Sequence, residues 1–276
     1  MKKKSKKIGK VSELMWVLGI LLVAIGVALC KKADLGVSMI AAPTFIIQEA
    51  IYPLWNGFTA GTVEYMVQGV ILIILCLAIR KFNWRYLLAF VVAVIYGYAL
   101  DLWMIVFGKE PFTEVYLRWI MLLIGDVCVA AGVACFFRTY MPLEVPELFV
   151  AEFAKRYNFK VNKTKLVYDL TCLAVSSVLA LTLFGDAKTF DWSKIAEQSY
   201  HSIGLGTVVT TFINAPIITF FGKILDKIFV YTPLFPKLEK ALSCDKKNNV
   251  KKETPAMDET SPADSASPSD SDDSSK

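Results

Sequence analysis

The sequence has little of what a metal centre or a hydrolase requires. It holds one histidine, His201, and its six cysteines form no CxxC pair. Metal sites need clustered histidine and cysteine ligands, whereas a lone cysteine in an apolar run behaves as a small hydrophobe. No HExxH motif, Gly-x-Ser-Gly motif or phosphate-binding loop occurs. The sequence therefore predicts a protein that is not an enzyme and holds no metal and no cofactor.

Charged residues are also scarce, at 20% of the 276 residues, and long stretches carry few or none. Roughly 17 to 25 consecutive apolar residues span a bilayer core. This pattern predicts an all-α, polytopic membrane helix bundle and argues against a nucleic-acid-binding protein. The six expected transmembrane helices are Leu14–Cys30, Thr62–Ile79, Tyr86–Phe107, Leu117–Phe137, Leu166–Gly185 and His201–Gly222.

A seventh apolar segment, Leu35–Ile51, is ambiguous, because it could cross the membrane, re-enter it or lie on its surface. Lys and Arg accumulate on the cytoplasmic side of membrane proteins. If the segment does not cross, 24 of the 30 Lys and Arg residues lie on one side and 6 on the other. If it crosses, the cytoplasm holds the minority. The charge pattern therefore predicts six spans in the cell membrane, with both termini cytoplasmic.

A second short segment, Pro142–Tyr157, is amphipathic. Apolar residues such as Val145 and Phe149 share one helical face, and acidic residues such as Glu144 and Glu147 lie largely opposite. Sixteen residues with this many charges do not span a membrane. We expect the segment to lie along the interface or to pack against the bundle.

The two short segments occupy equivalent places in an internal repeat. Gly26-Val27-Ala28 precedes the first and Gly132-Val133-Ala134 the second, at an offset of 106 residues. Breaks are expected in two later helices, at Tyr96–Tyr98 and at Asn214–Pro216. Each unit has an odd number of spans, so the second unit enters the membrane in the opposite orientation. The halves, about 14–107 and 117–222, are therefore predicted to form a 3+3 inverted repeat with two half-helices, an arrangement typical of secondary transporters.

The ends of the chain differ from this membrane domain, which we place at residues 14–230. Residues 1–13 carry six lysines and are expected to be cytoplasmic; no small-x-small cleavage site follows, so the first helix is predicted to remain uncleaved. Residues 231–276 form a cytoplasmic tail. From about residue 245 the tail is too polar to bury a core and is predicted to be disordered.

Several motifs resemble a known family. They are Ala33-Asp34-Leu35-Gly36-Val37-Ser38, the stretch Pro142–Leu148, Asp169 after a basic stretch, and Ile203-Gly204-Leu205-Gly206-Thr207 followed by Pro216. Over roughly residues 12 to 230 the chain resembles the YczE/YyaS/YitT-type family of bacterial integral membrane proteins. It departs from that family at Met39, where proline is common, and at Ala215, where glycine is common. The resemblance implies a five- or six-span inner-membrane protein without a settled activity.

Polar residues inside the apolar runs are the candidates for a binding site. Ionisable groups in a membrane are costly and usually face a bundle interior or a pathway. The candidate pathway or ligand-binding residues are Asp126, Glu64, Gln68, Asp101, Asn214 and Asp169. For Asp169 an ion pair with Lys165, one turn earlier, is the competing interpretation.

Small residues near the last span have two interpretations. Gly204, Gly206 and Thr207 could expose N–H groups to an anion at a helix start, or they could permit close helix packing. We favour packing for them, together with Gly97 and Pro216. His201, at the outer mouth of this span, is either a pH-sensitive gate or an interfacial cap.

These features favour one function and leave a second open. The leading hypothesis is a permease-like transporter of a small solute or ion. The alternative is a non-transporting membrane subunit that regulates or stabilises a partner complex. The lipid bilayer is the expected partner in both cases, and a membrane protein partner or a homo-oligomer is left open.

Overall fold

A computed structural model describes residues 12–55, 57–80, 82–108, 110–185, 190 and 192–229. Within these ranges the chain forms eight α-helices and one 3-10 turn, Trp192–Lys194, and no strand longer than an isolated bridge between Tyr200 and Ile203. The predicted all-α fold is confirmed. The basic N-terminal residues 1–11 and the acidic tail lie outside the described residues.

Six helices are long and apolar enough to cross a membrane, as predicted. Large apolar side chains on their outer faces are exposed, for example Leu77 at 71% and Ile105 at 78%. Side chains of this kind face lipid in a multi-pass membrane protein. The six helices are α1 (Ser12–Ala33), α3 (Ala60–Ile79), α4 (Arg85–Phe107), α5 (Val115–Phe136), α7 (Val161–Leu183) and α8 (Leu205–Ile228).

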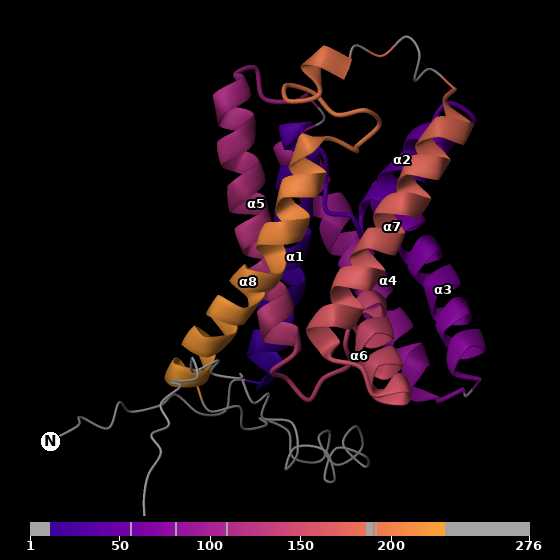
Figure 1. The fold of residues 1–276 in the computed structure, drawn as a ribbon, viewed down its shortest axis with the longest axis vertical. Helices are drawn as coiled ribbons and strands as arrows, with labels where there is room; N and C mark the ends of the chain where they lie inside the picture. The colour runs from indigo at the N-terminus through magenta and orange to yellow at the C-terminus, as the bar shows by residue number, and fades with distance from the viewer. Residues whose placement is uncertain are drawn as a thin grey trace, which may run out of the picture. The chain divides into compact units, whose positions relative to one another are not determined.

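Two short helices lie between these spans, at opposite ends of the bundle: α2 (Ala42–Ile51) and α6 (Val145–Tyr157) (Figure 1). Each has a proline in its first turn. Each begins with buried residues, and the last residues are half-buried in α2 and exposed in α6. At 10 and 13 residues, neither reaches the roughly 20 residues that a span requires. The prediction that Leu35–Ile51 does not cross the bundle is therefore confirmed.

The centre of the bundle is the contact between α1 and α5, where glycines bring the two backbones together. A Cβ atom built on Gly26 would lie 2.5 Å from the backbone oxygen of Gly125, and one on Gly132 would lie 2.7 Å from that of Gly19. Any larger residue would force the helices apart. The spacing between the two glycines is the same on each helix, so the four residues form two crossed pairs.

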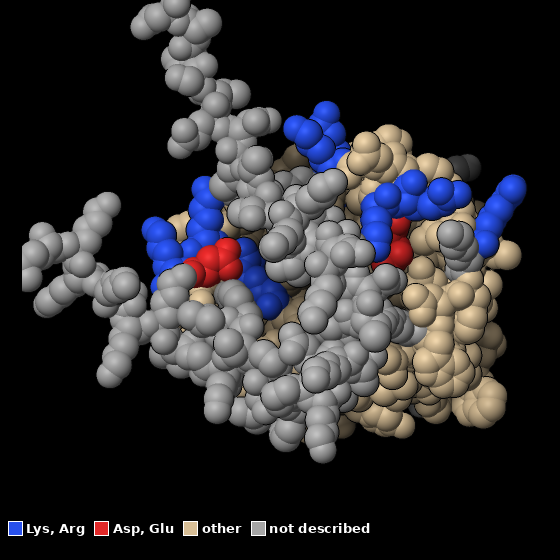
Figure 2. All heavy atoms as spheres, turned by 90° about the horizontal axis from the view of Figure 1, so that it is seen from below, with Lys and Arg blue, Asp and Glu red and all other residues tan. Residues whose placement is uncertain are grey.

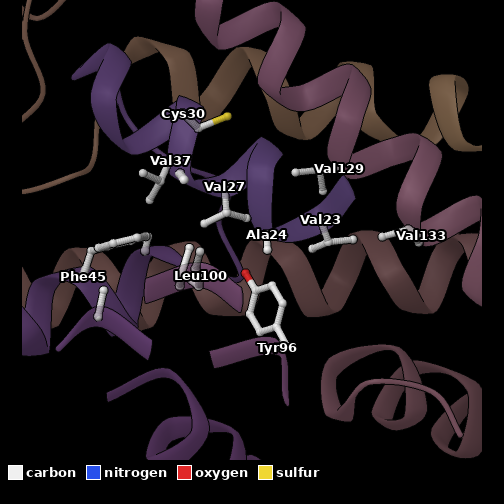
Figure 3. Packing of buried hydrophobic residues seen from close by; sticks show 14 of the residues in the cluster. Val23, Ala24, Val27, Cys30, Val37, Phe45, Tyr96, Leu100, Val129 and Val133 are labelled. Atoms are coloured by element: carbon white, nitrogen blue, oxygen red, sulfur yellow. The ribbon is translucent and has the colours of Figure 1, made fainter. Parts of the chain in front are cut away.

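Apolar side chains complete this core on the side of α4 (Figure 3). Val23 and Val27 of α1, Val129 of α5 and Tyr96 of α4 belong to one buried cluster, and Figure 3 shows the Tyr96 hydroxyl directed toward α1. Between helices in a bilayer, such contacts stabilise the bundle through van der Waals packing. The cluster holds α1, α4 and α5 together.

The breaks expected in two helices are not found. Helix α4 continues through Gly97, which instead permits close approach to α3: a Cβ on Gly97 would lie 2.7 Å from the Gly61 oxygen. Helix α8 continues through Pro216. A proline removes one backbone hydrogen bond, and transmembrane helices tolerate it because neighbouring groups can satisfy the freed carbonyl.

Helix α8 begins four residues later than the sequence predicts, because His201 and Ser202 adopt positive φ angles of 44° and 71°. The preceding turn pairs with the segment after α1. Val37 N–H donates to the Ser202 carbonyl at 3.0 Å, and Gly206 N–H donates to the Leu35 carbonyl at 2.9 Å. We call this backbone pairing the clasp. It joins two segments of the chain that are more than 160 residues apart.

Candidate functional site

The candidate site is a cavity of about 30 Å³ within the bundle, lined by apolar and by charged side chains. Its walls combine apolar side chains of α1 and α5 with polar side chains from α3, α4, α6, α7 and α8. The residues lining it are Val23, Val27, Ser38, Ile40, Ala41, Glu64, Tyr96, Val129, Val133, Glu144, Pro146, Glu147, Lys165 and Asn214. We call this space the central cavity.

Both short helices reach the central cavity with their N-terminal ends. Ala41 is the N-cap residue of α2 and Glu144 that of α6, and both residues line the cavity. The N-terminus of a helix carries a partial positive charge and unpaired N–H groups. The two helix ends therefore favour negative charge in the same small volume.

Three side chains from α3 and α6 form a hydrogen-bonded group on one side of the cavity. Gln68 Nε2 donates to Glu64 Oε1 at 2.8 Å and to Glu144 Oε1 at 2.7 Å. Glu64 is 3% exposed, Gln68 1% and Glu144 4%. A single amide thus holds two buried carboxyl groups, which we call the Glu64–Glu144 pair.

A lysine on α7 balances the negative charge of two further acids beside the cavity, Glu147 and Asp169. Lys165 Nζ lies 3.8 Å from Glu147 Oε1 and 3.8 Å from Asp169 Oδ1. Lys165 itself is only 9% exposed. The three side chains form a buried ion network, because a charge in this position is stable only when paired.

Burial also changes the protonation of the two acids on α6. Burial raises the pKa of the Glu144 carboxyl well above its usual range, and the neighbouring Glu147 raises it further. Burial likewise raises the pKa of Glu147, although Lys165 acts in the opposite direction. Both carboxyl groups therefore hold protons more strongly than carboxyl groups in water.

Several buried oxygen atoms around the cavity have no hydrogen-bond donor among the described residues. They belong to acidic or amide side chains, and buried acceptors of this kind are usually satisfied in folded proteins. They are Glu64 Oε2, Gln68 Oε1, Glu147 Oε2 and Asn214 Oδ1. The cavity is thus rich in acceptors. Among the described residues, no three His, Cys, Asp or Glu side chains are grouped so as to hold a metal ion.

Four of the six residues predicted from the sequence adjoin the central cavity. Glu64 and Asn214 line it, Gln68 is bonded to Glu64, and Asp169 lies beside Lys165. Gly97, Pro216 and the Gly204–Thr207 turn lie in helix contacts or within α8.

Asp101 and Asp126 occupy other places. Asp101 accepts hydrogen bonds from Thr59 Oγ1 at 2.6 Å and from the Gly61 N–H at 2.7 Å, at the start of α3. Its charge complements that helix end. Asp126 is 2% exposed and follows Gly125 in the contact with α1, and it is not among the lining residues.

Sequence reasoning missed Glu144, Glu147, Lys165 and Tyr96 as site residues. Helical periodicity placed both glutamates on a polar face, which was expected to lie opposite the packed face. A signal was available in the repeat. The two short segments were predicted to be equivalent half-helices, and half-helix ends typically form transporter sites.

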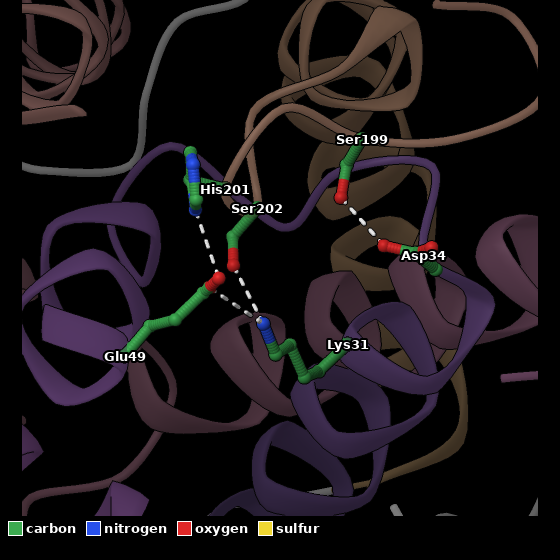
Figure 4. Close-up of polar contacts among 6 residues, drawn as sticks. All are labelled: Lys31, Asp34, Glu49, Ser199, His201 and Ser202. Carbon is green, nitrogen blue, oxygen red and sulfur yellow. Dashed lines mark hydrogen bonds and ion pairs between the residues drawn. The ribbon is translucent and has the colours of Figure 1, made fainter. Parts of the chain in front are cut away.

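A second polar group lies at the α2 end of the bundle, around a hollow of about 260 Å³ (Figure 4). Lys31 Nζ donates to Ser202 Oγ at 2.7 Å, His201 Nδ1 lies 2.8 Å from Glu49 Oε1, and Ser199 Oγ donates to Asp34 at 2.7 Å. The His201 ring also stacks on Phe184, with ring centroids 3.5 Å apart. These contacts connect the end of α1, the end of α2 and the turn before α8.

Comparison with known proteins matches the chain to a family and to a bacterial protein. A family model described as "Family of unknown function (DUF6198)" matches residues 11–223. The "Uncharacterized protein YyaS" of Bacillus subtilis (strain 168) is 26% identical over 217 residues, which cover 77% of this chain and 93% of that protein. No solved structure matches the chain. The predicted resemblance to the YyaS type of protein is confirmed.

Proposed function

The chain belongs to the family of unknown function DUF6198, and from this premise we propose that it is a permease-like transporter of a small solute or ion. The observation that carries the proposal is the central cavity. It places three carboxyl groups and one lysine inside an apolar bundle, with a fourth carboxyl group, that of Asp169, beside the lysine. Ionisable groups at such positions are expensive and typically line a substrate or ion route.

The two short helices support the same function. In secondary transporters, half-helices end near the binding site and turn their N-termini toward it. Here α2 and α6 come from opposite ends of the bundle, and residues at both N-termini line one cavity (Figure 1). We infer that each short helix serves as a gate on its own side.

An inverted repeat would explain why α2 and α6 enter the bundle from opposite ends. Contacts between α1 and α5 support such a repeat. At the offset of 106 residues, Gly19 corresponds to Gly125 and Gly26 to Gly132. The contact between Gly19 and Gly132 then corresponds to that between Gly125 and Gly26, and both are present. The contact of Gly132 with Val23 recurs in the same way between Gly26 and Val129. A two-fold relation between halves requires this pattern.

The distribution of charge supports a location in the cell membrane with the α6 end in the cytoplasm. Figure 2 shows Lys and Arg side chains over this end of the bundle. Exposed examples are Lys155, Arg156, Lys160, Lys163 and Lys223. In this orientation both termini are cytoplasmic, as the positive-inside rule favours. The proposed transporter acts without enzymatic chemistry and requires the bilayer as its partner.

Transport by the purified full chain in liposomes tests the proposal. Solute-induced currents and stopped-flow swelling are recorded for a panel of small cations, anions and neutral solutes. We expect one class to cross at least tenfold faster than in empty liposomes, and we expect Glu64→Gln to abolish the excess. Glu152→Gln is the matched control, because Glu152 lies on α6 and bonds to Tyr86 at 3.3 Å, away from the cavity. Absence of any flux, with a partner protein lost on Glu64→Gln, would favour the regulatory subunit instead.

A further inference from the structure

The unsatisfied atoms of the central cavity identify the kind of ligand that fits it. Glu64 Oε2, Glu147 Oε2 and Asn214 Oδ1 lack a donor among the described residues, and all three belong to residues that line the cavity and can accept a hydrogen bond. A buried acceptor without a donor is unfavourable. The missing group is therefore one that donates hydrogen bonds in several directions.

The size of the cavity limits the ligand further. Its volume is about 30 Å³, and roughly 10–15 Å³ measured in this way holds one water molecule. One or two water-sized groups fit, whereas drug-sized ligands occupy pockets of about 300–1,000 Å³. The ligand is thus comparable in size to ammonium or methylammonium.

The charges of the cavity determine the sign of the ligand. Lys165 also lines the cavity and acts on Glu144, but its ion pairs are with Glu147 and Asp169, and within the described part of the chain no lysine or arginine forms an ion pair with Glu64 or Glu144. Two carboxyl groups held by one amide resist simultaneous ionisation, because like charges at short range raise each other's energy. The pair holds a proton unless a cation replaces it.

We propose that the central cavity binds a compact protonated amine, such as ammonium or methylammonium, in exchange for a proton held by the Glu64–Glu144 pair. The carboxylic O–H bond breaks and the proton leaves to water. The resulting carboxylate accepts a hydrogen bond from an N–H group of the incoming cation. The net charge of the cavity does not change. This inference rests on the proposed function for its route across the membrane, but binding can be measured separately.

Competition with a proton makes the binding depend on pH. The titratable groups that face the pair are Tyr96 of α4, Glu147 of α6 and Lys165 of α7. Cys30 of α1 lies behind Tyr96, and Asp169 of α7 lies beside Glu147. Burial raises the pKa of Glu144 well above its usual range, so its carboxyl group holds a proton more strongly than a carboxyl group in water. Raising the pH removes the competing proton. The apparent Kd for the amine is therefore expected to fall about tenfold per pH unit while one proton is displaced.

Proton release in detergent solution provides the test. The purified full chain is mixed with ammonium chloride in weak buffer containing a pH indicator, and potassium chloride and choline chloride serve as comparisons. Potassium has a similar size and no N–H groups, and choline is too large for the cavity. We expect about one proton released per chain with ammonium, at least tenfold less with potassium or choline, and a loss of release in Glu144→Gln. The matched control Glu152→Gln should release as much as the parent chain.

Each outcome bears on the inference. Equal release with potassium or choline, or full release from Glu144→Gln, overturns it. If that variant does not fold, the unaltered chain remains decisive: an ammonium affinity that is independent of pH also overturns it. The experiments distinguish failure of the proposed transport function from failure of the proposed amine site. Proton release without flux in liposomes would remove the transport function and keep the site, whereas flux of another solute without proton release would do the opposite.

Discussion

The short helices α2 and α6 begin alike and differ in the charge they carry into the bundle. Their first turns align residue by residue: Ala41-Ala42-Pro43-Thr44 in α2 and Glu144-Val145-Pro146-Glu147 in α6. The N-cap residue and the third residue of the helix itself are neutral in α2, where they are Ala41 and Thr44. They are acidic in α6, where they are Glu144 and Glu147. The geometry of the half-helix is therefore common to both ends of the bundle, whereas of the two first turns only that of α6 carries ionisable groups.

A lysine accompanies each short helix, and the surroundings of the two lysines differ in the same way. Lys165 beside α6 is buried and contacts two acids. Lys31 beside α2 has a side chain that is 26% exposed, and it lies 3.9 Å from Glu49. The strength of an ion pair depends on how far it is removed from water. The α6 end thus depends on its charges for stability, and the α2 end depends on them much less.

The strongest test of this comparison removes each lysine. Lys165→Met leaves Glu147 and Asp169 buried without a cation, which costs about 3–5 kcal/mol when both stay ionised. Protonation of Glu147 relieves this cost, so the loss should be largest at alkaline pH. Lys31→Met should cost about 1 kcal/mol or less. Thermal unfolding in detergent measures both, and equal losses would contradict the comparison.

The next largest effect is expected at the glycine contacts between α1 and α5, which the two halves share. Gly26→Ala and Gly132→Ala each introduce a Cβ against backbone of the opposite helix, at 2.5 and 2.7 Å. Overpacking of this kind typically costs about 1–3 kcal/mol. We expect the two variants to lose similar stability in the same unfolding assay. Gly108→Ala meets no atom within 4 Å, so its loss reflects the positive φ of that residue alone. A large difference between Gly26→Ala and Gly132→Ala would count against a two-fold relation.

The smallest expected effect lies in the first turns themselves. Pro43→Ala and Pro146→Ala remove a rigid residue from the start of each short helix. Proline at such a position stabilises mainly by restricting the unfolded chain, by about 0.4–1 kcal/mol. Both variants should lose about this amount in chemical unfolding. A loss above 2 kcal/mol for Pro146→Ala alone would show that α6 depends on its proline for the placement of Glu144 and Glu147.

The six spans and both short helices could be predicted from the sequence, because apolar length and Lys and Arg placement are properties of single segments. The start of α8 could not. His201 and Ser202 adjoin an uncharged run, so hydropathy includes them in the span. Their backbone turns away from the helix through positive φ angles. Hydropathy carries no information about φ, and neither residue is a glycine that would have signalled it.

The site was predictable in part for a related reason. Glu64 and Asn214 stand out as polar residues within apolar runs, and they line the cavity. Glu144 and Glu147 do not stand out, since a polar face on a short helix usually meets water. Periodicity shows which residues share a face and not what that face contacts. Asp101 was a candidate because polarity alone does not reveal that a carboxylate binds the start of α3.

The clasp between Leu35–Val37 and the turn before α8 has a consequence for the biosynthesis of the chain. The N-terminal spans of a membrane protein are made first, and an unpaired backbone group in a bilayer costs several kcal/mol. The partners of the Leu35 carbonyl and the Val37 N–H are Gly206 and Ser202, which are synthesised more than 160 residues later. Until α8 inserts, the segment before α2 must find other donors and acceptors, from water or from the insertion machinery. The last span therefore completes the first half of the molecule as well as the second.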